Sequence, residues 1–198
     1  MKKLLIASVA LVSIAFANNA QDIFKTKCVM CHTAKVVDSK QNLIGPPADE
    51  VMLHVKEKYS NKQEAVKFMK DYILEPDPKK ALCASMDKFG IMPSQKGVIS
   101  EQEAQDVLEY MFDNFPREEY AQKESKDRAN ITFDKLDKDK DGFVSPKEFR
   151  EFRAKRNNID ANSFKQDLYF KKVDLNSDGK MDKDEFEKMR EQKINKGD

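Results

Sequence analysis

The chain of 198 residues contains few cysteines and histidines: three and two, respectively. It also has no excess of charge, because 36 Lys and Arg residues nearly balance 35 Asp and Glu residues. No basic block is long enough to form an electrostatic footprint for nucleic acid, so the charge pattern excludes nucleic-acid binding. Strand patterns are scarce, and the interleaved charges are typical of solvated helical faces.

Long apolar runs are absent except at the N-terminus, where LLIASVALVSIAFA follows two lysines. This run is shorter than the ~20 residues that cross a bilayer, and it ends in a small-x-small pattern at residues 15–17. These features predict a cleaved signal peptide over residues 1–17, with an uncleaved anchor as the alternative. We expect a periplasmic or otherwise exported protein that begins near Asn18 and has no stable membrane span after cleavage.

The composition changes near Pro116. All three cysteines lie upstream of it, where arginine is absent, and all six arginines lie downstream. The stretch 117–127 has little apolar content, so we expect it to connect a domain at 18–116 to a domain at 128–198. This connector could be a flexible linker or a solvent-exposed helix, and the sequence leaves that choice open.

Short helices joined by loops are expected in the first domain. Apolar residues with helical spacing indicate helices over 22–31 and 49–59. Asn61 and Glu64 make a possible capping pair for a third helix, which should stop before the Glu75-Pro76 bond.

The last helix of this domain carries the strongest signal. Ser100 and Glu103 form a capping box, and an apolar face runs from there until Pro116 closes the helix.

The motif CVMCH contains Cys28, Cys31 and His32 and allows three kinds of chemistry. A thioredoxin-like redox pair belongs to an alternating β/α pattern, which is missing here. A structural zinc site would need four ligands, drawn from the three cysteines and either His32 or His54. Covalent haem attachment accounts for all three motif residues, because two thiols can reach both vinyl groups along one porphyrin edge while the histidine lies beneath the iron.

Further features follow in order along the chain: Phe24 before the cysteines, the Gly45-Pro46 loop, the Met92-Pro93 loop and the helix closed at Pro116. This order, over residues 18–115, resembles the small class I (monohaem) cytochrome c family. The resemblance implies one haem c bound covalently by Cys28 and Cys31. It also implies that His32 and Met92 are the axial ligands of the iron.

Other residues compete with Met92 for the second axial position. They are Met86 and His54, and a His54 ligand would give a lower potential than methionine. We interpret His54 as a partly buried structural residue, and Met92 as the ligand rather than a core methionine. Cys83 is a free reactive thiol, one half of an intermolecular disulfide or a small buried apolar residue, and we favour the last interpretation.

Two stretches downstream, DKDKDGFVSPKE at 137–148 and DLNSDGKMDKDE at 174–185, match the twelve-residue calcium loop. Calcium takes six to eight oxygens, so the loop must coil tightly, and a glycine at position 6 permits the turn. In the first loop we expect the ligands Asp137, Asp139, Asp141, the Phe143 carbonyl, Ser145 and Glu148. In the second we expect Asp174, Asn176, Asp178, the Lys180 carbonyl, Asp182 and Glu185.

The loops start 37 residues apart, at 137 and 174, which leaves room for two helices between them. Val144 and Met181 occupy position 8 of each loop, where the two loops should pair through their backbones. Over Arg128 to Gln192 the chain resembles the paired EF-hand family, which implies two calcium ions. The predicted fold class is therefore all-α: a small cytochrome c-like helical domain followed by a four-helix EF-hand pair.

An iron held by histidine and methionine has no open coordination position, so we interpret the protein as an electron carrier and not an enzyme. It would move one electron per haem between redox protein partners. The alternatives are a calcium-dependent haem enzyme or sensor of peroxidase type, and a calcium-dependent scaffold. Calcium could be structural or regulatory, and the sequence identifies neither the partners nor the potential.

Overall fold

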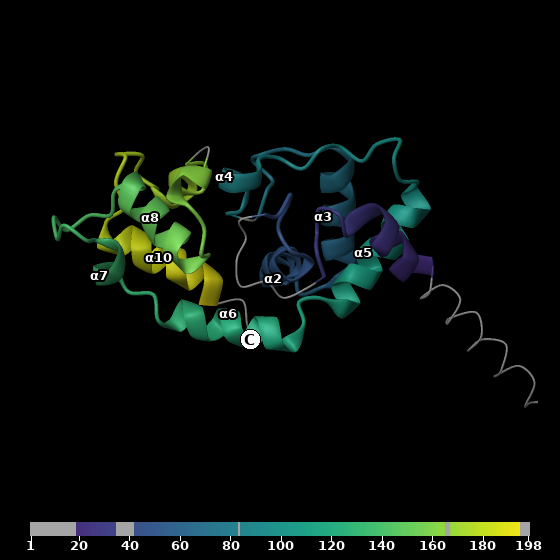
Figure 1. Cartoon of the computed structure of the whole chain (residues 1–198), viewed down its shortest axis with the longest axis horizontal. Helices are drawn as coiled ribbons and strands as arrows, with labels where there is room; N and C mark the ends of the chain where they lie inside the picture. Colours follow the sequence, from purple (N-terminus) through teal and green to yellow (C-terminus); the bar gives the residue numbers. More distant parts are fainter. Residues whose placement is uncertain (1–18, 35–41, 83, 165–166, 195–198) are drawn as a thin grey trace, which may run out of the picture.

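The computed structural model describes residues 19–34, 42–82, 84–164 and 167–194. Within these ranges the chain forms helices and no β-strand, which confirms the all-α prediction. Figure 1 shows an N-terminal domain, drawn in purple to teal, and a C-terminal domain, drawn in green to yellow. The predicted signal peptide and Cys83 lie outside the described residues. No helix in the described part of the chain is both long and apolar enough to cross a bilayer.

The N-terminal domain begins with α-helical residues 19–23, which continue into a π-helix. Its named elements are η1 (Phe24–Cys28), α2 (Ala48–Lys58), α3 (Lys62–Leu74), α4 (Met86–Phe89) and α5 (Glu101–Asn114). Single π-turns of this kind are frequent at functional sites. The short helix α4 was not predicted, because four residues carry too little periodicity to be recognised.

Both predicted helix caps of this domain are present. Glu64 donates its backbone N–H to the Asn61 side chain at the start of α3, at 3.1 Å. Ser100 and Glu103 form the expected reciprocal capping box at the start of α5. Each cap satisfies backbone donors that the first turn of a helix leaves without partners.

The core of the N-terminal domain lies mainly between α3 and α5. Ala65, Val66 and Met69 of α3 are buried with Val107 and Leu108 of α5. Burying one large apolar side chain stabilises a fold by about 1.5–3 kcal/mol, so this helix pair supplies a frame for the loops around it.

Phe24 ties the start of the chain to the end of α5. Its ring, 2% exposed, lies 5.4 Å from the Phe115 ring and 5.9 Å from the Tyr110 ring. Aromatic pairs at this separation contribute about 0.5–1.5 kcal/mol beyond their burial. The haem-attachment motif that follows Phe24 is therefore anchored on the most regular helix of the domain.

The C-terminal domain is built around two loop-flanking helix pairs. After the connecting helix α6 (Glu118–Ala129), its elements are α7 (Phe133–Leu136), α8 (Pro146–Arg156), η2 (Ala161–Ser163), α9 (Phe170–Val173) and α10 (Lys183–Ile194). The helices α7 and α9, which enter the two loops, are only four residues long, whereas α8 and α10, which leave them, have 11 and 12 residues.

Several phenylalanines meet in the core of this domain. Phe149, Phe170 and Phe186 are buried there, with Phe133 and Phe152 packed against them.

Phe164 is also buried, but it lines a cleft between the two domains instead.

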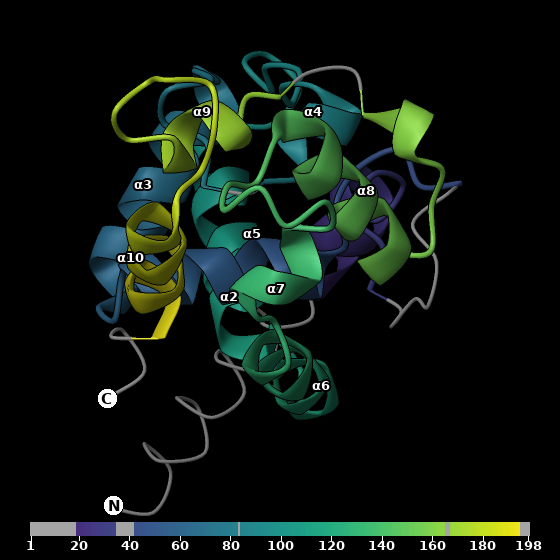
Figure 2. The ribbon, with the colours of Figure 1, turned by 90° about the vertical axis from the view of Figure 1, so that its left-hand side faces the viewer.

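The connector between the domains is helical over most of its length. Helix α6 covers Glu118–Ala129, so the solvent-exposed helix, and not a flexible linker, is the form that this stretch takes. Figures 1 and 2 both show α6 along one side of the molecule, beneath the domains that it connects. Its one buried residue, Tyr120, lines the interdomain cleft.

Candidate functional site

The cysteines and the histidine of CVMCH lie on the turn that ends the π-helix. The backbone N–H groups of Cys31 and His32 both donate to the Cys28 carbonyl, at 3.1 and 2.8 Å. This turn brings the two thiols and the imidazole to one short stretch of backbone. All three side chains are partly buried.

The His32 ring is held by a backbone carbonyl. Its Nδ1 donates to the Pro46 oxygen at 2.8 Å, and burial lowers the pKa of the imidazole. A ring that donates from Nδ1 in the neutral form carries its lone pair on Nε2, the state that a metal ligand requires. The predicted axial ligand thus has a fixed tautomer and orientation.

Gly45 is required by the close approach of two backbone segments at this site. A Cβ at position 45 would lie 3.0 Å from the Cys31 carbonyl oxygen, and the obstacle is backbone that cannot rotate away. Next to it, Ala48 donates its N–H to the Thr33 carbonyl at 3.0 Å. The Gly-Pro loop is therefore fastened directly beneath the attachment motif.

The Cys28 thiol of the motif is held in its neutral form. Burial and the neighbouring Cys31 raise the pKa of the Cys28 thiol to about 11. A redox nucleophile needs the opposite shift, because the thiolate is its reactive species. Among the described residues, the cysteines and histidines form no group of three ligand atoms suited to a metal ion. The motif therefore fits thioether formation better than the two alternatives.

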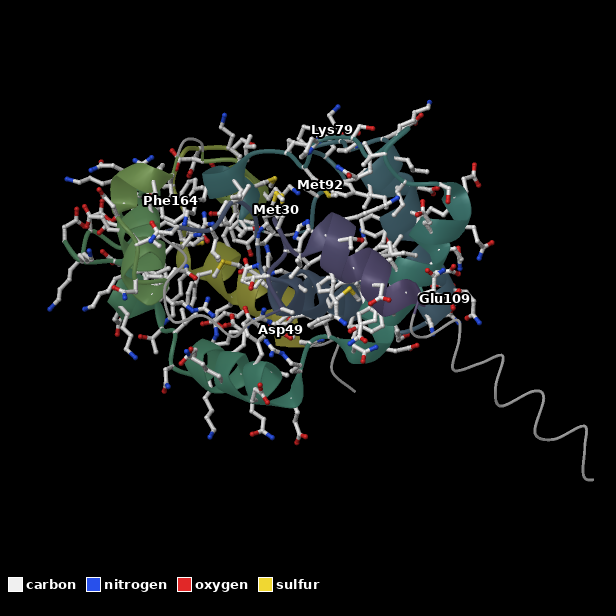
Figure 3. The ribbon with its side chains drawn as sticks, turned by 45° about the vertical axis from the view of Figure 1, so that its right-hand side comes forward. Met30, Asp49, Lys79, Met92, Glu109 and Phe164 are labelled. Atoms are coloured by element: carbon white, nitrogen blue, oxygen red, sulfur yellow. The ribbon has the colours of Figure 1, made fainter. Side chains whose placement is uncertain are left out.

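Met92, the predicted second axial ligand, lies partly buried in the loop after α4 (Figure 3). Gly90 ends α4 with a φ of 75°, which glycine adopts without strain. The loop is tied to the end of α3, because Gln95 donates its N–H to the Ile73 carbonyl at 2.8 Å. Ligation by Met92 remains a prediction.

The two rivals of Met92 lie in other surroundings. Met86 is buried at the start of α4, with 5% of its surface exposed. His54 lines the interdomain cleft, and its Nδ1 lies 3.1 Å from the Glu57 carboxylate. That contact matches the structural interpretation of His54.

The first calcium loop is shaped by hydrogen bonds between its carboxylates and its own backbone. Glu148 accepts the N–H groups of Lys138 and Ser145, both at 2.8 Å. Asp137 accepts the Gly142 N–H at 3.1 Å through Oδ2. Burial alone would raise the pKa of Glu148, but these hydrogen bonds outweigh it and hold the pKa below its ordinary value.

The polar groups of this loop fit a cation. Oxygens of Asp137, Asp139 and Asp141 lie within 4.8 Å of one another. The second carboxylate oxygen of Asp137 is buried and has no hydrogen-bond partner. A buried carboxylate oxygen without a donor is costly, and a calcium ion at the centre of the loop would satisfy it. Ser145 caps α8, so it would reach an ion through water.

The second loop repeats this arrangement. Glu185 accepts the Leu175 N–H at 2.8 Å, and Asp174 accepts the Gly179 N–H at 2.9 Å. Asp182 caps α10 by accepting the Glu185 N–H at 2.8 Å.

The two loops pair at position 8, as predicted. Val144 and Met181 exchange two backbone hydrogen bonds of 2.9 and 3.0 Å, and both side chains are fully buried.

A set of ion pairs that the sequence does not reveal lies at the domain interface. Three arginines of the second half bind carboxylates of the N-terminal domain: Arg117 with Asp49, Arg128 with Glu57 and Arg153 with Asp87. Asp49 lies just above α6 in Figure 3 and is 0% exposed. The restriction of arginine to the downstream half was the available signal, but charge composition does not identify partners.

Comparison with known proteins agrees with this geometry. Residues 17–113 match the cytochrome c family model, and residues 126–190 match the model of the EF-hand domain pair. An uncharacterized protein of Aquifex aeolicus (strain VF5) is 30% identical over 136 residues, covering 58% of this chain and 89% of the relative. No solved structure matches.

These domain types are those of a haem electron carrier that also binds calcium. The cytochrome c match implies covalent haem c, and the EF-hand match implies calcium binding. Both matches occur in the predicted order along the chain. The chain therefore belongs to the cytochrome c family in its N-terminal half and carries an EF-hand domain pair in its C-terminal part.

Proposed function

We propose that this protein is an exported c-type cytochrome that carries one electron at a time between two redox protein partners. One haem would be attached through Cys28 and Cys31, with His32 and Met92 on its iron. When bound, the haem supplies a reversible one-electron centre. The residues of the chain would attach it and orient it.

The hydrogen bond between His32 and the Pro46 carbonyl carries this proposal. It directs Nε2 away from the Gly-Pro loop and holds the ring in the one tautomer that can bind iron. A partner on the far ring nitrogen is usual for metal-ligating histidines, and it raises the basicity of the ligand. The two thiols beside it are partly buried and lie on one turn of the backbone, which supports covalent attachment.

Ligation by Met92 decides between an electron carrier and a haem enzyme. A methionine in the sixth position leaves no place for a substrate on the iron and raises the potential relative to a second histidine. Without it, peroxide or another small ligand could reach the metal, as in a peroxidase-like enzyme or a sensor.

Each EF-hand loop would hold one calcium ion. Glu148 and Glu185, at position 12, would each provide two oxygens, as this position does in the calcium loop. Their present hydrogen bonds to backbone N–H groups keep both carboxylates turned into the loops. The ions would stabilise the C-terminal domain.

An optical spectrum of the protein matured in a bacterial periplasm tests the proposal. We expect a sharp α band in the reduced protein and a methionine-to-iron charge-transfer band in the oxidised protein. Met92→Leu should abolish the charge-transfer band. The control Met86→Leu, which conserves side-chain volume, should retain it.

A high-spin iron that readily binds carbon monoxide in the unmodified protein would contradict the proposal. The protein would then be interpreted as an enzyme or sensor and not as an electron carrier. The N-terminal residue of the same preparation tests export. Cleavage of the signal peptide predicts that the mature chain begins near Asn18. An intact residue Met1 would contradict cleavage of the signal peptide.

A further inference from the structure

Asp87 of α4 is a buried carboxylate of the N-terminal domain whose partners come from the C-terminal domain. It is 1% exposed. The Arg153 guanidinium donates to its Oδ2, and the Tyr169 backbone N–H donates to its Oδ1 at 3.0 Å. Arg153 also donates to the Ala84 carbonyl, just before α4, at 2.7 Å. Figures 1 and 2 both show α4 against the α8 and α9 end of the C-terminal domain.

Each partner of Asp87 is connected to one calcium loop. Arg153 lies on α8, five residues after Glu148, the last ligand position of the first loop. Tyr169 is the N-cap residue of α9, five residues before Asp174, the first ligand position of the second loop. A single carboxylate is therefore held from both loops at once.

The Arg153 side chain is fixed by three aromatic rings of its own domain. Its guanidinium carbon lies 4.6 Å from the Phe164 ring centre, 5.5 Å from Tyr169 and 5.7 Å from Phe149. Cation–π contacts of this kind hold a partly buried guanidinium in one orientation. A change in the angle of α8 would therefore be transmitted to Asp87 instead of being absorbed by side-chain rotation.

The segment that contains Asp87 has little local structure of its own. Helix α4 has four residues, which is far below the length at which a helix is stable alone. Met92 follows Asp87 by five residues, directly after the turn at Gly90. The far end of the Met92 loop is tied to α3 through Gln95, so the position of its near end depends on what holds α4.

We propose that Asp87 is a positioning residue for Met92 and that calcium acts on the haem through it. Calcium-loaded EF-hands hold Asp87 through Arg153 and Tyr169, and this keeps the Met92 loop at the iron. Loss of calcium releases the hold, loosens α4 and weakens the bond between Met92 and the iron. The effect on the iron rests on the axial ligation proposed above, whereas the hold on α4 does not.

The test uses the full haem-loaded chain, with calcium and with a chelator. Two readouts are recorded: amide hydrogen exchange in α4, and the methionine-to-iron charge-transfer band of the oxidised protein. Chelation should speed exchange at the amides of Lys88 and Phe89 at least about tenfold, which corresponds to about 1.4 kcal/mol, and should weaken the band.

Variants show whether calcium acts through the contacts of Asp87 with the C-terminal domain or through a general stabilisation of the protein. In Arg153→Met and in Asp87→Asn, the amides of α4 should exchange rapidly and the charge-transfer band should be weak, whether or not calcium is present. The control Arg150→Met removes an arginine of the same helix whose partner, Asp167 at 3.0 Å, belongs to the C-terminal domain. This control should respond to calcium as the unmodified protein does.

Two results would overturn the proposal: α4 exchange that calcium does not change in the unmodified protein, or a full calcium response in Arg153→Met. The measurement on the unmodified protein decides even if a variant fails to fold. A third outcome is possible: calcium slows exchange in α4, but the oxidised protein shows no charge-transfer band at all. Met92 would then not be the iron ligand, and the proposed effect on the iron would be wrong. The contact that holds α4 would still be supported.

Discussion

The cofactor sites of the two domains differ in charge: the calcium loop is anionic, whereas groups at the haem-attachment motif are neutral. The first calcium loop gathers three carboxylates within 4.8 Å of one another, where a cation relieves their repulsion. At the attachment motif, burial keeps the His32 ring and the Cys28 thiol neutral. The C-terminal domain should therefore depend on a bound ion for its stability, whereas the N-terminal domain depends on the packing of α3 against α5.

Removal of calcium should give the largest effect and separate the two domains. An ion present at 100 times its dissociation constant stabilises the folded state by about 2.7 kcal/mol per site, so two sites contribute about 5 kcal/mol. Urea unfolding with and without chelator, followed by circular dichroism and by the haem bands, measures this. An unfolding curve that chelation leaves unchanged would contradict the dependence of the C-terminal domain on bound calcium.

Arg117→Ala should cost about 3 kcal/mol, because it leaves the fully buried Asp49 carboxylate without its charged partner. The control Arg190→Ala, in a half-exposed pair with Glu187 at 3.6 Å, should cost at most about 1 kcal/mol. Urea unfolding of both variants measures the difference. Equal costs would mean that the interface at Asp49 contributes no more than an ordinary surface pair.

Acid should weaken the contact between the domains before it unfolds the core of either. Burial alone would raise the pKa of Glu57, but His54 and the Arg128 guanidinium hold it below its ordinary value. A carboxylate with a lowered folded pKa stabilises the structure above its unfolded pKa of about 4.3 and loses that contribution as the pH falls. Glu124, between Arg128 and Arg156, behaves in the same way.

Hydrogen exchange at α6 amides between pH 5 and pH 3 tests this, after correction for intrinsic rates. Faster exchange below about pH 4 is expected. Protection of α6 that stays constant down to pH 3 would contradict it.

The smallest expected effect comes from two serines, one in each domain. Ser100 and Ser145 each open a helix with a capping box, and loss of such a cap costs about 1 kcal/mol. Ser100→Ala should show this cost with or without calcium. Ser145→Ala should also lower the calcium affinity, because position 9 of the loop is then lost. Calcium titration and urea unfolding of both variants decide, and equal calcium affinity would exclude a role of Ser145 at the ion.

The presence of two EF-hand loops could be predicted, because each loop is a motif of twelve consecutive residues, whereas the individual calcium ligands stay predictions. The backbone pairing of Val144 with Met181 followed from loop position alone and is observed. The capping box at Ser100 and the helix cap at Asn61 were predicted for the same reason: the contacts span three residues. Local spacing fixes such contacts without knowledge of the fold.

The interface could not be predicted in this way. Asp87 and Arg153 are 66 residues apart, and Asp49 and Arg117 are 68 apart, so no periodicity connects them. Helix α4 is held by contacts with another domain and has no strong propensity of its own. The form of the connector was left open for the related reason that α6 is polar on most sides.

Intact-mass analysis of the protein purified from a periplasm under denaturing conditions tests the central claim most directly. A chain that begins near Asn18 and retains the mass of one haem is expected, and Cys28→Ser with Cys31→Ser should lose that mass. A full-length chain without haem, or a haem retained after both substitutions, would contradict covalent attachment at CVMCH.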